Sequence, residues 1–279
     1  LHYGMGAFEG VRAYETSDGP AIFKLEKHTE RLFNSARILG MSIPFDADIL
    51  NQAQREVVTK NNLNSAYIRP MCFYGSEGMG LRADNLKVHV MIAAWEWGSY
   101  LGEDNMRKGI RIRTSSYIRH HAHPSLSGAK MNGNYINSMM ALKEAQDHGF
   151  DEALMLDVDG FVSEGSGENI FVIKDEVLYT PHLTSALPGI TRDTIFTLAK
   201  SLGYKITEKK ISCDDIYNAD EAFFTGTAAE VTPIRGLDGN QIGIGSRGLI
   251  TEKLQALYFD CVHGRNEDYK YWIESGRCS

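Results

Sequence analysis

Residues 127–138, Ser-Gly-Ala-Lys-Met-Asn-Gly-Asn-Tyr-Ile-Asn-Ser, are the most informative stretch of the chain. Lys130 lies among small residues just before Tyr135, Met139 and Leu142, whose spacing predicts a helix with these three side chains on one face. Partial burial at this position would disfavour the ammonium form and favour a nucleophilic amine, which Tyr135 could hydrogen-bond one turn away. Taken alone, the stretch fits a solvated lysine in a glycine-rich loop better than it fits a catalytic one.

Three further segments bear on the chemistry. Residues 163–169, Ser-Glu-Gly-Ser-Gly-Glu-Asn, place Glu164 in a predicted tight turn between two strands, where a purely structural carboxylate is an alternative. Residues 187–192 lead into a predicted helix with Thr191 at its N-cap, and free N–H groups at such an end form an anion site. Residues 224–230 follow a predicted strand with small residues and offer backbone amides and hydroxyls to a second anion contact. Each segment is weak alone, but an amine, a carboxylate and a phosphate-binding backbone are together what a pyridoxal phosphate enzyme provides.

These motifs resemble those of the fold-type IV (class IV) pyridoxal phosphate enzymes, and specifically of the bacterial branched-chain amino-acid aminotransferase family. The resemblance covers nearly the whole chain and includes four more motifs: His2-Tyr3-Gly4, Phe8-Glu9-Gly10-Val11-Arg12, Ala66-Tyr67-Ile68-Arg69-Pro70 and Thr232-Pro233. It implies an α+β fold similar to D-amino-acid aminotransferase, with a small α/β sandwich domain and a larger domain containing a pseudo-barrel of strands. We expect the small domain at residues 1–94, an interdomain loop at 95–108 and the large cofactor domain at 109–279.

The resemblance also implies roles for individual residues. Lys130 would bind pyridoxal 5′-phosphate covalently and then move a proton, Tyr135 would contact the ring hydroxyl oxygen, and Glu164 would face the ring nitrogen. The residues implied to bind the phosphate are Arg31, Ile190, Thr191, Gly226 and Thr227.

For the substrate, the family implies that Tyr67 and the backbone from Thr227 through Ala228 to Ala229 hold the α-carboxylate. Arg69 would bind the distal carboxylate of glutamate. The aromatic side chains implied to line an apolar pocket are Tyr3, Phe8, Trp97 and Tyr100. Core packing is the alternative for any of these four, and Tyr3 could serve the neighbouring subunit of a homodimer or higher homo-oligomer.

The implied reaction transfers the amino group of L-leucine, L-isoleucine or L-valine to 2-oxoglutarate, giving branched 2-oxoacids and L-glutamate. Alternatives within the fold are a D-amino-acid or (R)-amine transaminase and an aminodeoxychorismate lyase, against which Tyr67, Arg69 and residues 133–138 favour the branched-chain type. Outside the fold, Lys130 could belong to a cofactor-free aldolase, or the chain could be a non-catalytic phosphate-ligand module. An aldolase would have no use for two phosphate-binding segments and a carboxylate for a ring nitrogen. Residues 117–127 depart from the family pattern, which bears on substrate range more than on reaction type.

Composition points to small-molecule chemistry. The 279 residues include 29 Lys and Arg against 36 Asp and Glu, and the net charge of -7 argues against binding to nucleic acid or anionic membranes. No apolar run approaches the roughly 18 to 20 residues of a membrane span. Four cysteines without a CxxC pair favour a reduced cytosolic setting, and three histidines at positions 120, 121 and 123 are expected in a loop rather than at a metal. The chain begins at Leu1, so an upstream segment is expected to be missing from it.

The expected elements follow from periodicity and turn residues. Strands are predicted at 11–14, 21–25, 66–74, 87–97, 110–114, 152–157, 161–163, 169–173, 177–179, 205–209 and 222–225, of which those between 152 and 179 are expected to form an antiparallel meander. Helices are predicted with Leu32, Ala36 and Leu39 on one face, from an N-cap at Asp46 or Asp48 towards Asn61, at 191–202 with Ile195, Leu198, Ala199 and Leu202 buried, and at 249–262.

Overall fold

The structure, a computed structural model, describes residues 3–98, 102–121 and 128–278. Contacts divide the chain into two compact units, which are described separately below. Unit 1 comprises Leu1–Trp97, Ala129–Tyr135 and Asp260–Ser279, and unit 2 comprises Gly98–Gly128 and Ile136–Phe259. This grouping differs from the domain boundaries expected from the sequence, which remain a prediction, because two later segments join the N-terminal unit.

Unit 1 is built on a five-stranded antiparallel sheet centred on β4 (Ala66–Tyr74). One edge of β4 pairs with β5 (Val88–Trp95) along its whole length. Its other edge pairs first with β2 (Val11–Thr16) and then with β1 (Gly6–Phe8), and β3 (Gly19–Ile22) extends the sheet beyond β2. Glu9, between β1 and β2, still donates its N–H to the carbonyl of Pro70, so the chain stays against β4 across the break.

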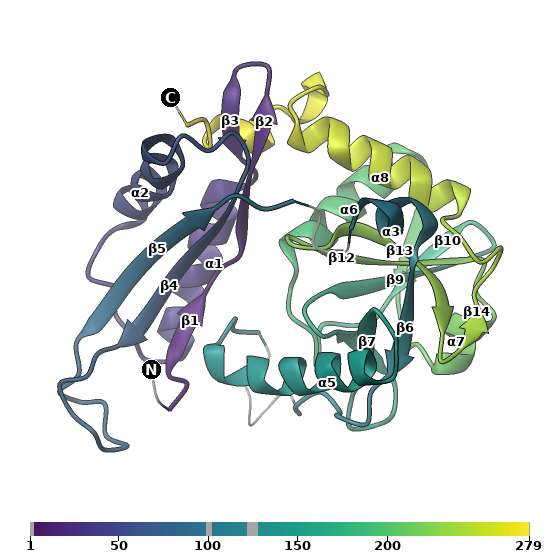
Figure 1. Ribbon diagram of the computed structural model, residues 1–279, viewed down its shortest axis with the longest axis horizontal. Coiled ribbons are helices and arrows are strands. Elements are labelled where there is room, and N and C mark those ends of the chain that lie inside the picture. Colours follow the sequence, from purple (N-terminus) through teal and green to yellow (C-terminus); the bar gives the residue numbers. More distant parts are fainter. Residues whose placement is uncertain (1–2, 99–101, 122–127, 279) are drawn as a thin grey trace. The chain divides into compact units, whose positions relative to one another are not determined.

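Two helices accompany this sheet (Figure 1), α1 (Leu25–Ile38) and α2 (Ala47–Lys60). Asp46 caps α2 by accepting a hydrogen bond from the N–H of Ile49, as one of the two predicted caps. Leu32 and Ala36 of α1 are buried in one hydrophobic cluster with residues of β1, β4 and α2, as their spacing predicted. A short 3-10 turn, η2 (Glu267–Tyr269), and the helix α9 (Tyr271–Glu274) complete the unit.

The segment that carries Lys130 is held along the free edge of β1. Ala7 forms an isolated bridge with Met131, and the N–H of Phe8 donates to the carbonyl of Lys130 at 3.1 Å. The N–H of Lys130 donates to Oγ of Ser35 on α1 at 3.0 Å. The chain then passes through a 3-10 turn, η1 (Asn132–Asn134), into α5 (Tyr135–Asp147).

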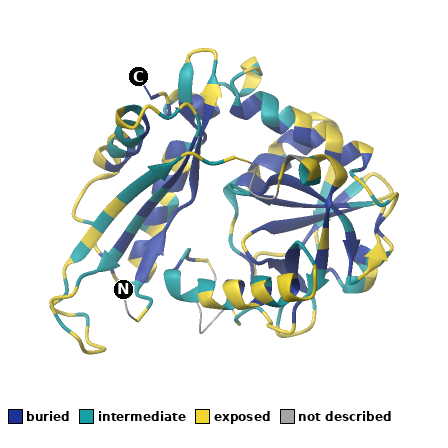
Figure 2. Ribbon diagram, viewed as in Figure 1, coloured by how far each residue is buried: buried dark blue, intermediate teal, exposed yellow. Residues whose placement is uncertain are grey.

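Unit 2 contains a nine-stranded mixed sheet in the order β11-β10-β9-β12-β13-β6-β7-β8, with β14 paired to β13. Its strands are β6 (Ile110–Thr114), β7 (Glu152–Leu156), β8 (Val162–Gly165), β9 (Asn169–Lys174), β10 (Val177–Thr180), β11 (Lys205–Glu208), β12 (Glu221–Gly226), β13 (Glu230–Leu237) and β14 (Asn240–Gln241). The central strands are buried over most of their length (Figure 2). The predicted meander is wrong as a continuous motif. β7 pairs with β8 and β9 with β10, but β8 and β9 lie at different places in the order, because turn residues predict hairpins without fixing the non-local partner of each strand.

The helices of unit 2 include α3 (Glu103–Lys108), α6 (Ile190–Ser201), α7 (Cys213–Tyr217) and most of α5 and α8 (Leu249–Val262). Thr191 is not the N-cap of α6: Gly189 is, and Thr191 is the second helical residue. Leu202 is also exposed rather than buried, since the helix ends at Ser201. None of the helices among the described residues has both the length and the apolar character that a membrane crossing requires.

The buried face of α5 also differs from the prediction. Met139 is 70% exposed, whereas Ser138, Ala141 and Ala145 are buried. Ala141 and Ala145 cluster with β7, so the inward face uses small residues that let the helix approach the sheet closely. Periodicity of large apolar residues therefore predicted the helix, and its most buried positions are occupied by smaller residues.

Candidate active site

The amine of Lys130 is engaged by an aromatic hydroxyl. Its Nζ donates to Oη of Tyr135 at 2.6 Å and lies 5.1 Å from the centroids of both the Tyr135 and the Phe8 rings. These two rings contact each other edge to face at 4.7 Å. Lys130 is only partly buried, but its amine is fixed on both sides, so the interpretation as a freely solvated loop lysine is wrong.

Other residues predicted to bind substrate lie on β4 and next to β5 in the same unit. Tyr67 is buried, accepts a hydrogen bond from Nη2 of Arg69 at 3.3 Å, and stacks at a tilt on Trp97 with 4.8 Å between centroids. The guanidinium of Arg69 lies 4.6 Å from the centroid of Phe8. Its Nε is buried and has no hydrogen-bond partner among the described residues, so one donor of this guanidinium is unused.

The two other predicted aromatic residues are Tyr3 and Tyr100. Tyr3 is 55% exposed and donates to the carbonyl of Met79 at 3.5 Å. Tyr100 lies outside the described residues. Trp95, which the sequence analysis did not name, contacts both Tyr67 and Trp97, and its position in the strand after β4 was the only signal for it.

Arg31 is bound in a buried charged group on α1. Its Nε and Nη2 donate to the two carboxylate oxygens of Glu9 at 2.6 and 2.8 Å, and Nδ1 of His28 lies 2.8 Å from the same carboxylate. Although burial opposes it, the charge of Arg31 lowers the pKa of Glu9 to about 2. Burial lowers the pKa of His28, although the hydrogen bond to Glu9 opposes this. Because an ionised carboxylate can only accept, Nδ1 of His28 is the donor in this contact. Arg31 was predicted to bind the phosphate, whereas Glu9 and His28 were not among the predicted site residues.

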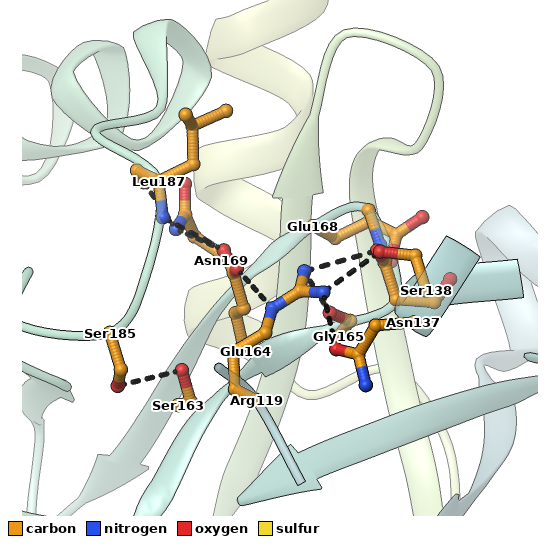
Figure 3. A network of polar contacts seen from close by, with 12 residues as sticks. Arg119, Asn137, Ser138, Ser163, Glu164, Gly165, Glu168, Asn169, Ser185 and Leu187 are labelled. Carbon is orange, nitrogen blue, oxygen red and sulfur yellow. Dashed lines mark hydrogen bonds and ion pairs between the residues drawn. The ribbon is translucent and has the colours of Figure 1, made fainter. Parts of the chain in front are cut away.

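In unit 2, Glu164 is buried and accepts from three donors (Figure 3). Nε of Arg119 donates at 2.8 Å, the N–H of Leu187 at 3.1 Å, and Nδ2 of Asn169 at 3.5 Å. Glu164 belongs to β8 and not to the tight turn that the sequence predicted; the turn follows it. Three donors on one buried carboxyl group suit an anion, so Glu164 can offer a negative charge to a cationic partner.

Arg119 was missed by the sequence analysis, although residues 117–127 were noted as unusual. Its remaining four N–H bonds are used within unit 2 (Figure 3). Nη1 donates to Oδ1 of Asn137 and Oγ of Ser138, and Nη2 donates to the carbonyls of Gly165 and Ser166. Arg119 therefore places its positive charge beside Glu164 and also holds the turn that follows Glu164.

Two backbone segments predicted to bind phosphate are joined through Asn169. Its Nδ2 donates to the carbonyl of Leu187, and a Cβ on Gly189 would lie only 2.0 Å from its Oδ1, so a larger residue before Ile190 and Thr191 would displace Asn169 or the start of α6. Asn169 is also the cross-strand partner of Thr225, which precedes Gly226 and Thr227. Thr225 Oγ1 is buried and has no hydrogen-bond partner among the described residues. An anion at the start of α6 would meet unsatisfied N–H groups of its first turn.

The segment after Thr227 is a tight connection to β13. Ala228 is partly exposed, Ala229 is buried, and the carbonyl of Ala229 accepts from Oγ1 of Thr232 at 2.6 Å. These two residues therefore present a fixed backbone.

Comparison with known proteins identifies the family. The family of class IV amino-transferases matches residues 6–237. The chain belongs to this family. It is 63% identical over 272 residues to the branched-chain-amino-acid aminotransferase of Pseudomonas aeruginosa, covering 98% of this chain and 89% of that protein. It is 45% identical over 276 residues to the enzyme of the same name from Escherichia coli K12, again covering 98% and 89%.

Solved structures agree with this class IV assignment. A crystal structure of the Escherichia coli branched-chain amino acid aminotransferase matches with a TM-score of 0.97 at 44% identity, covering 100% of this chain and 92% of that one. A T.th. branched-chain amino acid aminotransferase with pyridoxamine 5′-phosphate matches with a TM-score of 0.95 at 47% identity, covering 98% and 90%. The fold-type IV α+β architecture expected from the sequence is thereby confirmed.

The residues present fit a pyridoxal phosphate cofactor. A lysine amine is held beside a phenol, a buried carboxylate with cationic support is available for a ring nitrogen, and a helix start joined to a strand end offers N–H groups and an unsatisfied hydroxyl to a phosphate. The lysine and the phenol belong to unit 1, and the carboxylate and the helix start belong to unit 2.

Proposed function

We propose that this chain catalyses the pyridoxal phosphate-dependent transfer of the amino group from L-leucine, L-isoleucine or L-valine to 2-oxoglutarate. The observation that carries the proposal is the hydrogen bond from the Lys130 amine to Tyr135, in a class IV chain whose similar relatives are named as branched-chain aminotransferases. In this proposal the protein is a cytoplasmic homodimer. Four free cysteines are compatible with a reducing compartment, and sedimentation velocity tests the dimer.

The residues that would hold the cofactor are Lys130, Tyr135, Glu164, Arg31, Ile190, Thr191, Gly226 and Thr227. When bound, pyridoxal phosphate supplies an electron sink that acidifies the Cα–H bond of the amino acid. Glu164 would hold the ring nitrogen in its protonated form, and Arg119 would keep the carboxylate oriented towards it. The phosphate would take the N–H groups of Ile190 and Thr191, the Gly226–Thr227 backbone and the charge of Arg31.

Lys130 would act as the proton carrier. Its Nζ would accept the proton from Cα of the donor amino acid and pass it to C4′ of the cofactor. In the second half-reaction Nζ would carry a proton from C4′ to Cα of the 2-oxoacid. Such transfer by a placed base contributes about 10² to 10⁴ in rate. Tyr135 would keep Nζ in place, because its Oη already accepts from this amine.

The substrate would be recognised by residues of β4 and β5 and by the backbone of Ala228 and Ala229. Tyr67 and this backbone would bind the α-carboxylate, and Phe8, Trp97, Tyr3 and Tyr100 would surround an apolar side chain. Arg69 would pair with the distal carboxylate of glutamate, which its unpartnered Nε favours. When leucine binds, Nη2 of Arg69 would keep its hydrogen bond to Tyr67, and the guanidinium would keep its contact with the Phe8 ring.

A panel of amino donors with 2-oxoglutarate as acceptor tests this function. We expect turnover with L-leucine, L-isoleucine and L-valine, and at least about 100-fold less with their D-enantiomers or with (R)-amines. Preference for the D-enantiomers would replace the proposal by a D-amino-acid transaminase of the same fold. Lys130→Ala should abolish turnover while leaving the far-ultraviolet spectrum unchanged, and full activity of that variant would refute the role of Lys130.

A further inference from the structure

Unit 2 buries three carboxyl groups near a single guanidinium. Glu152 is fully buried, and Glu164 and Glu168 are each 5% exposed. Arg119 has five N–H donors, of which one goes to Glu164 and four go to neutral oxygens. No described donor of Arg119 therefore reaches Glu152 or Glu168, and the two carboxyl groups lack a cation of their own.

Glu168 is packed tightly beneath the Gly226–Thr227 loop. Its Oε2 accepts the N–H of Gly167 at 3.0 Å, and a Cβ on Gly165 would lie 2.7 Å from the same oxygen. A Cβ on Gly226 would touch Cγ of Glu168 at 3.6 Å, so the Glu168 stem supports the backbone at the end of β12. The position is thus fixed by neighbours on β8 and β12, and the side chain is almost completely removed from solvent.

Glu152 supplies the partner for Glu168. It lies two residues before Leu154, which pairs with Gly165, so Glu152 continues the same face of β7 towards the turn that contains Glu168. Its Oε1 accepts the N–H of Ala153 at 2.7 Å, whereas Oε2 is buried without a well-formed hydrogen bond among the described residues. The hydroxyl and N–H groups of Ser166 are near this carboxyl group and oppose the rise of its pKa, but burial outweighs them. An unsatisfied carboxyl oxygen in a buried site is relieved if a proton is shared with a second carboxyl group.

We propose that Glu168 is a positioning residue for the Gly226–Thr227 loop and acts in its neutral form, with one proton held between Glu152 and Glu168. If Glu152 and Glu168 were both ionised in this buried site, their charges would repel each other and the charge of Glu164. A negative charge on Glu168 would also repel the phosphate that we propose the Gly226–Thr227 loop binds. The inference therefore rests on the proposed cofactor site.

The charges around Glu168 agree with this assignment. Burial, with the neighbouring Glu152, raises the pKa of Glu168 well above its usual value, and burial likewise raises the pKa of Glu152. Glu164 on β8 raises the pKa of Glu168 further and Arg119 lowers it. Glu230, the partner of Gly226 on β13, is a fourth buried carboxyl group at this end of the sheet and adds no positive charge.

Spectrophotometric titration of the apo-protein with pyridoxal phosphate between about pH 6 and about pH 9 tests the proposal. Glu168→Gln keeps the shape of the side chain and stays neutral at every pH, whereas Glu168 itself ionises as the pH rises. The ratio of the wild-type Kd to the Kd of this variant should therefore rise by about tenfold from the lowest to the highest pH. Glu176→Gln, an exposed residue in the turn before β10, is the matched control and should give a constant ratio. A constant ratio for Glu168→Gln would overturn the proposal.

Stability of the apo-protein gives a second readout that needs no cofactor. A carboxyl group with a raised pKa in the folded state stabilises below its unfolded pKa, and this contribution is lost as the pH rises through the folded pKa. The Glu152→Gln variant cannot lose stability in this way, because its amide does not ionise. Its urea midpoint should therefore exceed that of the wild type by a margin that grows between about pH 5 and about pH 8. A margin that does not change with pH would refute the shared proton. A wild type that binds no pyridoxal phosphate would refute the proposed function and the positioning role. The stability comparison would still test whether Glu152 and Glu168 share a proton.

Discussion

Lys130 is fixed at both its backbone and its amine. Ser35 accepts its N–H, Phe8 donates to its carbonyl, and Tyr135 accepts from Nζ. An amine that is held in this way loses little rotational freedom when it reacts, which is one source of rate in an enzyme. The chemistry proposed for this residue depends on that fixation as much as on its type.

Arg69 should discriminate between the two kinds of substrate. Arg69→Ala removes the guanidinium that we expect to pair with the distal carboxylate, so kcat/KM of the half-reaction with L-glutamate should fall by about 100-fold. The value for L-leucine should fall by less than about tenfold. Stopped-flow measurement of both half-reactions checks this, with the exposed Arg82→Ala as the control. An equal loss for both donors would show that Arg69 does not bind the distal carboxylate.

Glu9 should stabilise unit 1 through its buried ion pair. Glu9→Gln leaves the guanidinium of Arg31 without its counter-charge, which should lower the free energy of unfolding by about 3 to 5 kcal/mol at neutral pH. Because the pKa of Glu9 is lowered to about 2, its stabilisation is present above its unfolded value and is lost as the pH falls through about 2. Urea unfolding of both proteins should therefore show a difference that narrows in acid. A difference that stays constant down to strong acid would contradict the assigned charge.

At the scale of elements, local patterns predicted several boundaries well. β4, β6 and α8 have the bounds that the sequence predicted, because glycines stand at their ends: Gly75 after β4, Gly109 before β6 and Gly248 before α8. β13 was not predicted, since Pro233 and Gly236 interrupt its pattern, although it lies between β12 and β6 in the sheet. Its place depends on pairing with strands distant in sequence, which no local pattern reports.

The start of α6 should depend on the absence of a side chain at Gly189. Gly189→Ala would place a methyl group 2.0 Å from Oδ1 of Asn169, so the first turn of the helix or the asparagine must shift. We expect a loss of about 1 to 3 kcal/mol in unfolding free energy and weaker binding of pyridoxal phosphate. Gly167→Ala, at a nearby glycine with no atom within 4 Å of the added carbon, is the matched control. Similar effects of the two variants on cofactor affinity would contradict this account.

At the scale of the whole molecule, the candidate site draws on segments that are far apart in the sequence. Residue types and motifs identified Lys130, Tyr135 and Glu164, because their chemistry is recognisable in a short window. Arg119 was missed, since its partner Glu164 lies 45 positions away and only the folded chain shows their ion pair. Glu9 and His28 were not predicted as site residues, because Glu9 lies 22 positions from Arg31 and 19 from His28 and only the folded chain brings them together.

The central claim is that the Lys130 amine carries the cofactor. Borohydride reduction of the protein saturated with pyridoxal phosphate, followed by proteolysis and mass spectrometry, locates the lysine that becomes modified. We predict one modified lysine per chain, Lys130, with loss of the visible absorption band and of activity in parallel. Modification at another lysine while Lys130 stays free, or retention of activity after complete reduction, would contradict the account.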